Sequence, residues 1–202
     1  MIGDDARRIR QLKSGDRAAF EDIVSRHYQS VYRQLWHLCN NEQIAAELTQ
    51  ETFVQAWKSL DSFSGRAALR TWLYTIGVRV WHRWKNSNDE PARENAPPEN
   101  WAESLTDYSP GPAQLLETQA TQQEVQTALQ QLPAAYREAI VLFYIQGLKY
   151  REVALALDVP LGTVKSRLHQ GLQRMRALMM ENTESDLQEG GTPCELKSLK
   201  KC

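Results

Sequence analysis

Two short stretches of the chain combine basic, aromatic and amide side chains in patterns suited to a polyanion. The first, from Trp81 to Lys85, interleaves indole rings with cationic groups. Flat rings beside cations stack on unpaired bases, so this pattern favours single-stranded nucleic acid. Arginine pairs with guanine, glutamine with adenine and lysine with guanine or phosphate, which suits duplex DNA. The second stretch carries such a row: Lys165, Ser166, Arg167, His169 and Gln170.

The basic charge of the chain is concentrated around these two stretches. The 202 residues have a formal net charge of −1, from 24 Lys and Arg against 25 Asp and Glu. Residues 65–86 nevertheless carry five basic side chains and no acidic one, and residues 160–178 carry four and none. These runs could be the solvated faces of amphipathic helices, but solvated faces normally mix both signs. The acid-free runs therefore favour binding to a polyanion.

Other chemistries find little support in the sequence. A phosphate-binding glycine loop, a His-Glu-x-x-His motif and a nucleophile elbow are all missing, so we predict no catalytic residue and no cofactor. His37 and Cys39 are too few for a metal site, and three cysteines are too few for a disulfide scaffold. With a charged N-terminus and no apolar run near the ~18 residues of a membrane span, we expect a cytoplasmic protein without membrane insertion.

The first part of the chain is predicted to be helical throughout. Apolar residues recur every three or four positions over residues 20–38 and 44–60, and a third helix is expected over residues 69–85. Trp57 and Trp72 are expected in the core. Trp81 and Trp84 cannot both share one narrow buried face with Trp72, so at least one of them is expected at the surface.

The last part of the chain is also predicted to be helical and to contain a helix-turn-helix. Residues 114–131 have a helical composition. Residues 136–145 could form a buried strand or a helix, and helical spacing and the absence of a partner strand favour the helix. Helices over residues 150–157 and 163–179 are separated by a five-residue turn, and the second has the dimensions of a DNA-recognition helix.

Between these parts lies a segment that cannot be one continuous helix. Residues 86–112 contain five prolines and six acidic residues. Proline fixes φ and removes a backbone donor, so we expect a flexible acidic linker. The predicted fold class is therefore all-α, with two small helical domains at residues 1–88 and 114–180. The linker spans residues 89–113, and a flexible tail spans residues 181–202.

Four segments together resemble a known family. AAELTQETFVQAW (residues 45–57) is similar to region 2.2 of bacterial RNA polymerase sigma factors, and residues 63–76 are similar to region 2.3. LPAAYREA (residues 132–139) resembles the start of region 4, and residues 150–169 resemble its helix-turn-helix. Only these two regions are present, which is typical of the extracytoplasmic-function (ECF, group four) sigma factors of the sigma-70 family.

The resemblance implies a non-enzymatic factor that binds core RNA polymerase at the β′ clamp and the β flap. It implies promoter-specific transcription initiation under the control of an anti-sigma factor. The clamp would be met by Leu48, Gln50, Glu51 and Val54. A flipped base would enter the loop containing Ser62, Phe63, Ser64 and Gly65.

The promoter contacts implied by the resemblance fall on the two stretches singled out above. Arg79, Trp81, Arg83 and Lys85 would approach minus-ten DNA. The row from Lys165 to Gln170 would face the minus-thirty-five major groove. Arg79 and the Gln170-Gly171 pair depart from the family pattern of asparagine and Arg-Ala, so the promoter sequence stays open.

Two other classes of function remain possible at this point. A free-standing helix-turn-helix regulator would bind duplex DNA without polymerase, usually as a dimer. It would leave the aromatic and basic stretch of the first domain without a role. A redox or metal sensor would act through Cys194 and Cys202 in the tail, where thiols are accessible.

Overall fold

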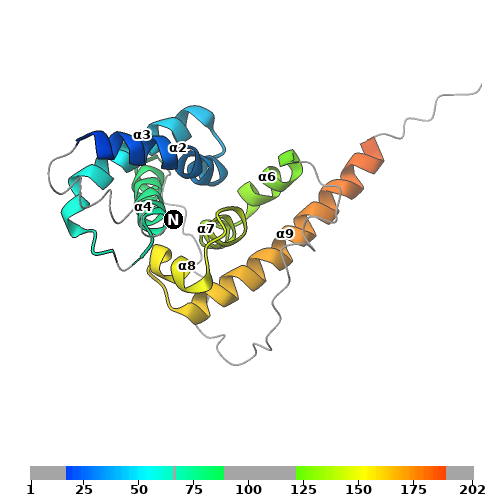
Figure 1. The fold of residues 1–202 in the computed structure, drawn as a ribbon. Helices are drawn as coiled ribbons and strands as arrows, with labels where there is room; N and C mark the ends of the chain where they lie inside the picture. Colours follow the sequence, from blue (N-terminus) through cyan, green and yellow to red (C-terminus); the bar gives the residue numbers. More distant parts are fainter. Residues whose placement is uncertain (1–16, 66, 89–121, 190–202) are drawn as a thin grey trace, which may run out of the picture.

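The computed structural model describes residues 17–65, 67–88 and 122–189 of the chain (Figure 1). These ranges contain seven α-helices and no strand, so the predicted all-α class is confirmed. The first group of helices is α2 (Arg17–Cys39), α3 (Glu42–Lys58) and α4 (Leu69–Asn88). The second group is α6 (Gln122–Gln131), α7 (Ala134–Ile140), α8 (Tyr150–Leu157) and α9 (Leu161–Glu189).

The expected break between the first two helices is confirmed at Asn40 and Asn41. Asn40 adopts a left-handed conformation with φ of 53°, which asparagine tolerates better than most residues. The Asn41 side chain then caps α3 by accepting a hydrogen bond from the backbone N–H of Ile44 at 3.0 Å. After α3, a short 3-10 turn (η1, Leu60–Ser62) leads into the loop before α4.

Helix α4 is buried on nearly every side. It packs against α2 and α3 of its own group and against α8 of the second group. Gly77 permits the close approach to α2, because a Cβ there would lie 3.2 Å from Oε1 of Gln34. Gln34 is itself fully buried and donates from Nε2 to the carbonyl oxygen of Tyr74 at 3.0 Å.

The segment that could have been a strand is helical, as predicted. Helix α7 continues without a break into a π-helical turn, η2 (Val141–Ile145), in which the N–H of Gln146 donates to the carbonyl of Val141 at 2.9 Å. Gly147 then ends the helix with φ of 66°, in the left-handed region that glycine adopts without strain. The chain reverses there toward α8.

The helix-turn-helix is confirmed as well, with one difference in length. Helix α8 has the predicted bounds, and Asp158 makes the turn with φ of 55°. Helix α9 begins at Leu161, two residues before the expected start, and runs to Glu189 rather than ending near residue 179. Helix α9 therefore extends past residue 181, where the tail was predicted to begin. The first helix-breaking residues after residue 171 are Gly190 and Gly191, and they explain the extension.

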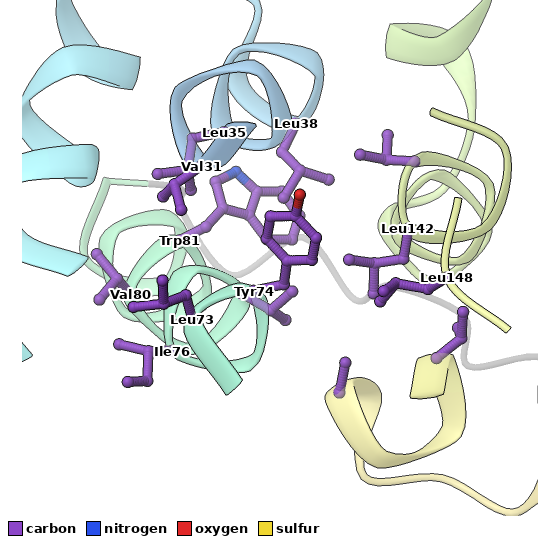
Figure 2. Packing of buried hydrophobic residues seen from close by; sticks show 14 of the residues in the cluster. Val31, Leu35, Leu38, Leu73, Tyr74, Ile76, Val80, Trp81, Leu142 and Leu148 are labelled. Atoms are coloured by element: carbon purple, nitrogen blue, oxygen red, sulfur yellow. The ribbon is translucent and has the colours of Figure 1, made fainter. Parts of the chain in front are cut away.

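The two groups of helices share a continuous apolar core. Figure 2 shows Trp81 and Tyr74 of α4 beside Leu38 of α2, with Leu142 and Leu148 of the second group across from them. Helix α2 also contacts α6, α7 and η2. Both predicted helical groups are present, and α4 in addition packs against α8 of the second group.

Several expectations fall outside the described residues. These are the linker at residues 89–113, the start of the helix expected at residue 114, and the cysteines Cys194 and Cys202.

Candidate nucleic-acid interface

Helix α9 presents its polar row on the side opposite its buried residues. The buried side consists of Val164, Leu168, Gly171, Leu172 and Met175. Lys165 and His169 are exposed, and Ser166, Arg167 and Gln170 are partly buried. The structure therefore brings all five predicted residues together on one turn-and-a-half of helix at the surface.

Neighbouring groups already orient part of this row. The hydroxyl of Ser166 donates to the carbonyl of Thr163 at 3.0 Å, and Nε2 of Gln173 lies 3.1 Å from Nε2 of His169. The Nε atom of Arg167 is buried and has no hydrogen-bond partner within the described ranges. The guanidinium end of this partly buried side chain, and not its enclosed Nε, is the part that could reach an acceptor on DNA.

Gln170 has a partner from outside its own helix. The hydroxyl of Tyr136 in α7 donates to Oε1 of Gln170 at 2.7 Å. The guanidinium of Arg174 lies over the ring of Tyr136, with 4.6 Å between its Cζ atom and the ring centroid. Sequence reasoning did not find Tyr136, because its spacing only identified it as part of the buried face of α7.

Fewer of the predicted DNA-contacting residues of α4 lie at the surface than expected. Arg79 and Arg83 are exposed and Lys85 is partly buried, whereas Trp81 is only 2% exposed. The expectation that Trp81 meets DNA from the surface is therefore wrong for this structure. Its ring lies between α2 and α4 beside Leu38 (Figure 2), with its centroid 5.2 Å from that of the His82 ring. Lys85 Nζ lies 5.7 Å from the centroid of the Trp81 ring.

The loop between α3 and α4 offers a small polar surface. Ser62, Ser64 and Gly65 are exposed, and Gly65 has φ of 73°. Phe63 was expected in the same loop surface but is 8% exposed, with its ring centroid 5.1 Å from that of Trp72. Phe63 therefore anchors the loop to the core and does not line its exposed side.

A mixed polar and apolar face runs along α3. Gln50, Val54 and Trp57 follow one another at helical spacing and are exposed, and Glu51 beside them is partly buried. Val54 and Trp57 are each 44% exposed. Trp57 was expected in the core and is instead at the edge of it, with one side of its ring against Phe20. Leu48, expected on this face, is buried at 6% exposure.

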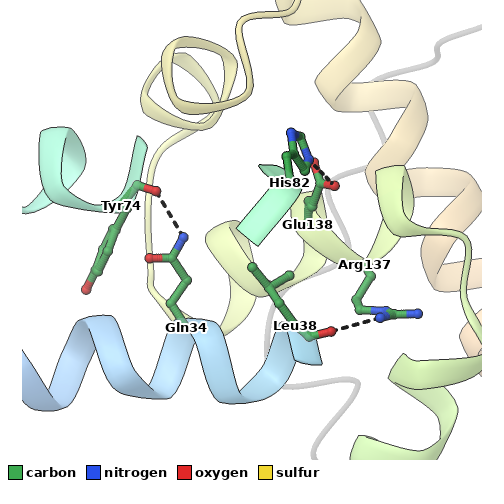
Figure 3. A network of polar contacts seen from close by, with 6 residues as sticks. All are labelled: Gln34, Leu38, Tyr74, His82, Arg137 and Glu138. Atoms are coloured by element: carbon green, nitrogen blue, oxygen red, sulfur yellow. Dashed lines mark hydrogen bonds and ion pairs between the residues drawn. The ribbon is translucent and has the colours of Figure 1, made fainter. Parts of the chain in front are cut away.

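The contacts that hold the two groups together were not foreseen. Arg137 donates to the carbonyls of Leu129, Gln130 and Leu132 near the end of α6 and, at 2.8 Å, to the carbonyl of Leu38 near the end of α2. A cation there satisfies carbonyls that a helix end leaves unpaired. Figure 3 shows this contact beside the pair formed by Glu138 Oε1 and His82 Nε2, 2.8 Å apart.

A further link joins α8 to α4. Glu152 accepts a hydrogen bond from the N–H of Lys149 at 2.9 Å, which caps α8, and another from the hydroxyl of Thr71 at 3.0 Å. The sequence signals only the cap, since an acidic residue in a first turn is common. Which helix would lie opposite cannot be read from the spacing.

The other titratable groups do not assemble into a reactive centre. Burial lowers the pKa of His37, and the hydrogen bond that its Nδ1 donates to Oε1 of Gln126 partly opposes this shift. Burial raises the pKa of the Cys39 thiol, so this cysteine is less nucleophilic than an exposed one. Within the described ranges, groups of three or more potential metal ligands do not occur. None of the helices there is long and apolar enough to cross a membrane.

An all-α protein with a helix-turn-helix and acid-free basic surfaces belongs among DNA-binding transcription proteins. Comparison with known sequences narrows this class. The pattern of Sigma-70 region 2 matches residues 23–90, and that of Sigma-70, region 4 matches residues 122–175. The ECF RNA polymerase sigma factor SigW of Bacillus subtilis is 35% identical over 179 residues, covering 84% of this chain and 94% of SigW.

Two solved structures have the same fold. CnrH, solved in complex with the cytosolic domain of CnrY, matches with a TM-score of 0.65 and 25% identity, over 88% of this chain and 97% of CnrH. The sigma factor RpoE of Bartonella quintana, solved with the anti-sigma factor NepR, matches with a TM-score of 0.62 and 24% identity, over 80% of this chain and 96% of that one.

This chain therefore belongs to the ECF RNA polymerase sigma factors of the sigma-70 family. It is an alternative sigma factor for transcription initiation and not an enzyme. The free-standing regulator is not favoured, because such a regulator would have no use for region 2.

Proposed function

We propose that this sigma factor binds core polymerase through α3 and reads its promoter through α9 and the exposed side of α4. The observation that carries the proposal is the acid-free polar row of α9. This row lies at the surface because the opposite, apolar side of the helix is buried. Because RNA polymerase works in the cytoplasm of bacteria, we place the protein there. The functional units would be residues 1–88 and 114–180, joined by the linker at residues 89–113.

The polymerase contact would be made by the exposed face of α3. Gln50, Glu51 and Val54 lie on it, and Trp57 extends it by one turn. Two exposed apolar side chains flanked by polar ones are typical of a protein contact rather than of a solvated helix. Aromatic residues contribute strongly to such interfaces, so Trp57 is the strongest addition to the predicted set. The occupant would be the coiled coil of the β′ clamp.

The minus-thirty-five contact would be made by the row on α9. Residues near the start of a recognition helix reach base edges, and basic residues further along reach phosphates. Arg167 would pair with guanine through its terminal guanidinium nitrogens, and Lys165 and His169 would lie closest to the phosphates. Gln170 would read a further base.

The minus-ten contact would be made by Arg79, Arg83 and Lys85, with a flipped base taken by Ser62, Ser64 and Gly65. Arg83 lies 3.9 Å from Glu51 and is largely exposed, so this weak pair would yield to a phosphate at little cost. The indole of Trp81 is not proposed as a DNA contact, because it is buried in this structure.

We also propose an anti-sigma factor as the regulator. The support is that CnrH was solved with the cytosolic domain of CnrY and RpoE with an anti-sigma factor. A partner that covers either α3 or α9 would block one of the two proposed contacts. That would be enough to prevent initiation.

The experiment that tests the function is co-purification with core polymerase followed by transcription from a randomised promoter pool. Val54→Asp is expected to weaken core binding by at least about tenfold, because it places a charge in an apolar contact. Gln29→Asp adds the same charge on the exposed side of α2 and should leave core binding unchanged.

Promoter reading is tested with the same pool. Arg167→Ala should weaken minus-thirty-five recognition by roughly 1–3 kcal/mol, the value of a bidentate base contact. Arg26→Ala, an exposed charge on α2, is the matched control. If the chain ignores core polymerase but shifts promoter duplex alone, the regulator replaces the proposed function.

A further inference from the structure

Tyr136 runs along one flank of the recognition helix. Its Cβ lies where α7 and α9 come closest, since a Cβ on Gly171 would be 3.2 Å from it. Its ring lies under Arg174, 4.6 Å from the guanidinium carbon. Its hydroxyl ends 2.7 Å from Oε1 of Gln170. The tyrosine is 3% exposed, so its hydroxyl reaches Gln170 from a buried position.

The order of these contacts follows the geometry of α9. Successive residues of an α-helix are turned by about 100°, which places Gly171 at the edge of the buried side, Arg174 on the flank and Gln170 on the polar side. The Tyr136 side chain therefore extends from the core, and its hydroxyl donates to Gln170 at the edge of the polar row. Glycine at 171 is what lets α7 lie close enough for this.

The hydrogen bond determines how the Gln170 amide is turned. A carbonyl oxygen has two acceptor positions, and the tyrosine hydroxyl occupies one of them. One acceptor position on Oε1 and both N–H groups of Nε2 remain for another partner. If the amide were flipped, the tyrosine would have to accept, and its own proton would lose its partner in a buried position, which is costly.

An adenine edge matches this arrangement. In the major groove, adenine offers a donor at N6 and an acceptor at N7, whereas guanine offers two acceptors. Oε1 of Gln170 can accept from N6 while Nε2 donates to N7. We infer that Tyr136 is a positioning residue, whose hydroxyl holds the Gln170 amide in the orientation that reads adenine in the minus-thirty-five element. The inference rests on the proposed reading of DNA by α9.

A merely structural role for the pair predicts a different result. If the bond only stabilised the contact between α7 and α9, removing it would lower the stability of the protein and affect all promoter positions alike. A positioning role affects one base position and requires Gln170. The test therefore measures base preference position by position and not overall binding.

The experiment uses the full chain assembled with core polymerase and a promoter pool randomised through the minus-thirty-five element. We expect the wild type to enrich adenine at one position. Gln170→Ala should abolish that preference, and Tyr136→Phe should reduce it by roughly five- to tenfold, the effect of losing one side-chain hydrogen bond. Adding Tyr136→Phe to Gln170→Ala should change nothing further at that position.

Tyr32→Phe on α2 removes a phenolic hydroxyl elsewhere and is the matched control. Thermal melting of each variant shows whether it is folded. If Tyr136→Phe does not fold, Gln170→Ala still tests the assignment of adenine to Gln170. The inference is overturned if Tyr136→Phe keeps the full preference, if it weakens all positions equally, or if Gln170→Ala leaves adenine enriched. A wild type that binds core polymerase but selects no minus-thirty-five sequence overturns the proposed reading itself.

Discussion

Helices α4 and α9 both carry an acid-free basic surface, but the protein surrounds them differently. Helix α9 is covered on one side only, and its opposite side is a polar row open to solvent. Helix α4 is enclosed by α2, α3 and α8, and its basic surface is reduced to a strip containing Arg79 and Arg83. Tyr74 and Trp81 of α4 are buried in the core, whereas the polar side chains of α9 are at least partly exposed.

This difference shows that a helix's sequence pattern and its accessibility are separate properties. The row on α9 needs no rearrangement to meet a major groove. The indole of Trp81 would meet a base only after α4 and its neighbours had separated. Substitutions in the core around α4, in the contacts between the two groups and between α7 and α9 should therefore have different effects on stability.

Removing the buried indole of α4 should be the most damaging change. Trp81→Ala deletes a ring that is 2% exposed, and we expect the free energy of unfolding to fall by about 3–5 kcal/mol. Trp57→Ala removes an indole that is 44% exposed, so its cost should be about half as large, near 2 kcal/mol. Urea denaturation followed by far-ultraviolet circular dichroism measures both. Equal losses would mean that the two rings are equally buried in solution.

Arg137 tests whether the second group of helices really covers α4. Arg137→Met keeps the aliphatic stem but removes the hydrogen bonds that Arg137 donates to four carbonyls, one at the end of α2 and three at or just after the end of α6. We expect a loss of about 3 kcal/mol, since charged donors form the stronger hydrogen bonds. Arg151→Met, on the exposed side of α8, is the control and should be nearly neutral. The same denaturation measurement applies, and an unchanged midpoint for Arg137→Met would contradict the observed packing.

The contact between α7 and α9 should respond to a single methyl group. In Gly171→Ala the new Cβ would lie 2.9 Å from Cδ1 of Ile140, and the overpacking should cost about 1–3 kcal/mol. Gly162→Ala makes the same change in α9 where nothing lies within 4 Å, and it should be neutral or slightly stabilising. The difference in melting temperature between the two variants isolates the packing effect. If Gly171→Ala were the more stable of the two, α7 and α9 would be further apart than described.

Much of the fold could be predicted from residue spacing. Apolar residues at intervals of three and four fixed the helices, Asn41 and Gly147 marked ends, and the turn at Asp158 was placed correctly. For α9, the side of the helix that faces the core was also predictable. The burial of Phe63 and Trp81 was not, because it depends on packing against residues outside their own loop or helix turn, as Phe63 packs on Trp72.

Local sequence by itself determined the all-α class, the helix-turn-helix and the polar row of α9, because helical periodicity depends only on residues a few positions apart. The tertiary structure decided which indole is core and which is surface, how Arg137 joins the two groups, and that Tyr136 reaches Gln170. Those outcomes depend on contacts between residues tens of positions apart. Periodicity states which side chains share a face of a helix, and only packing determines what lies against that face.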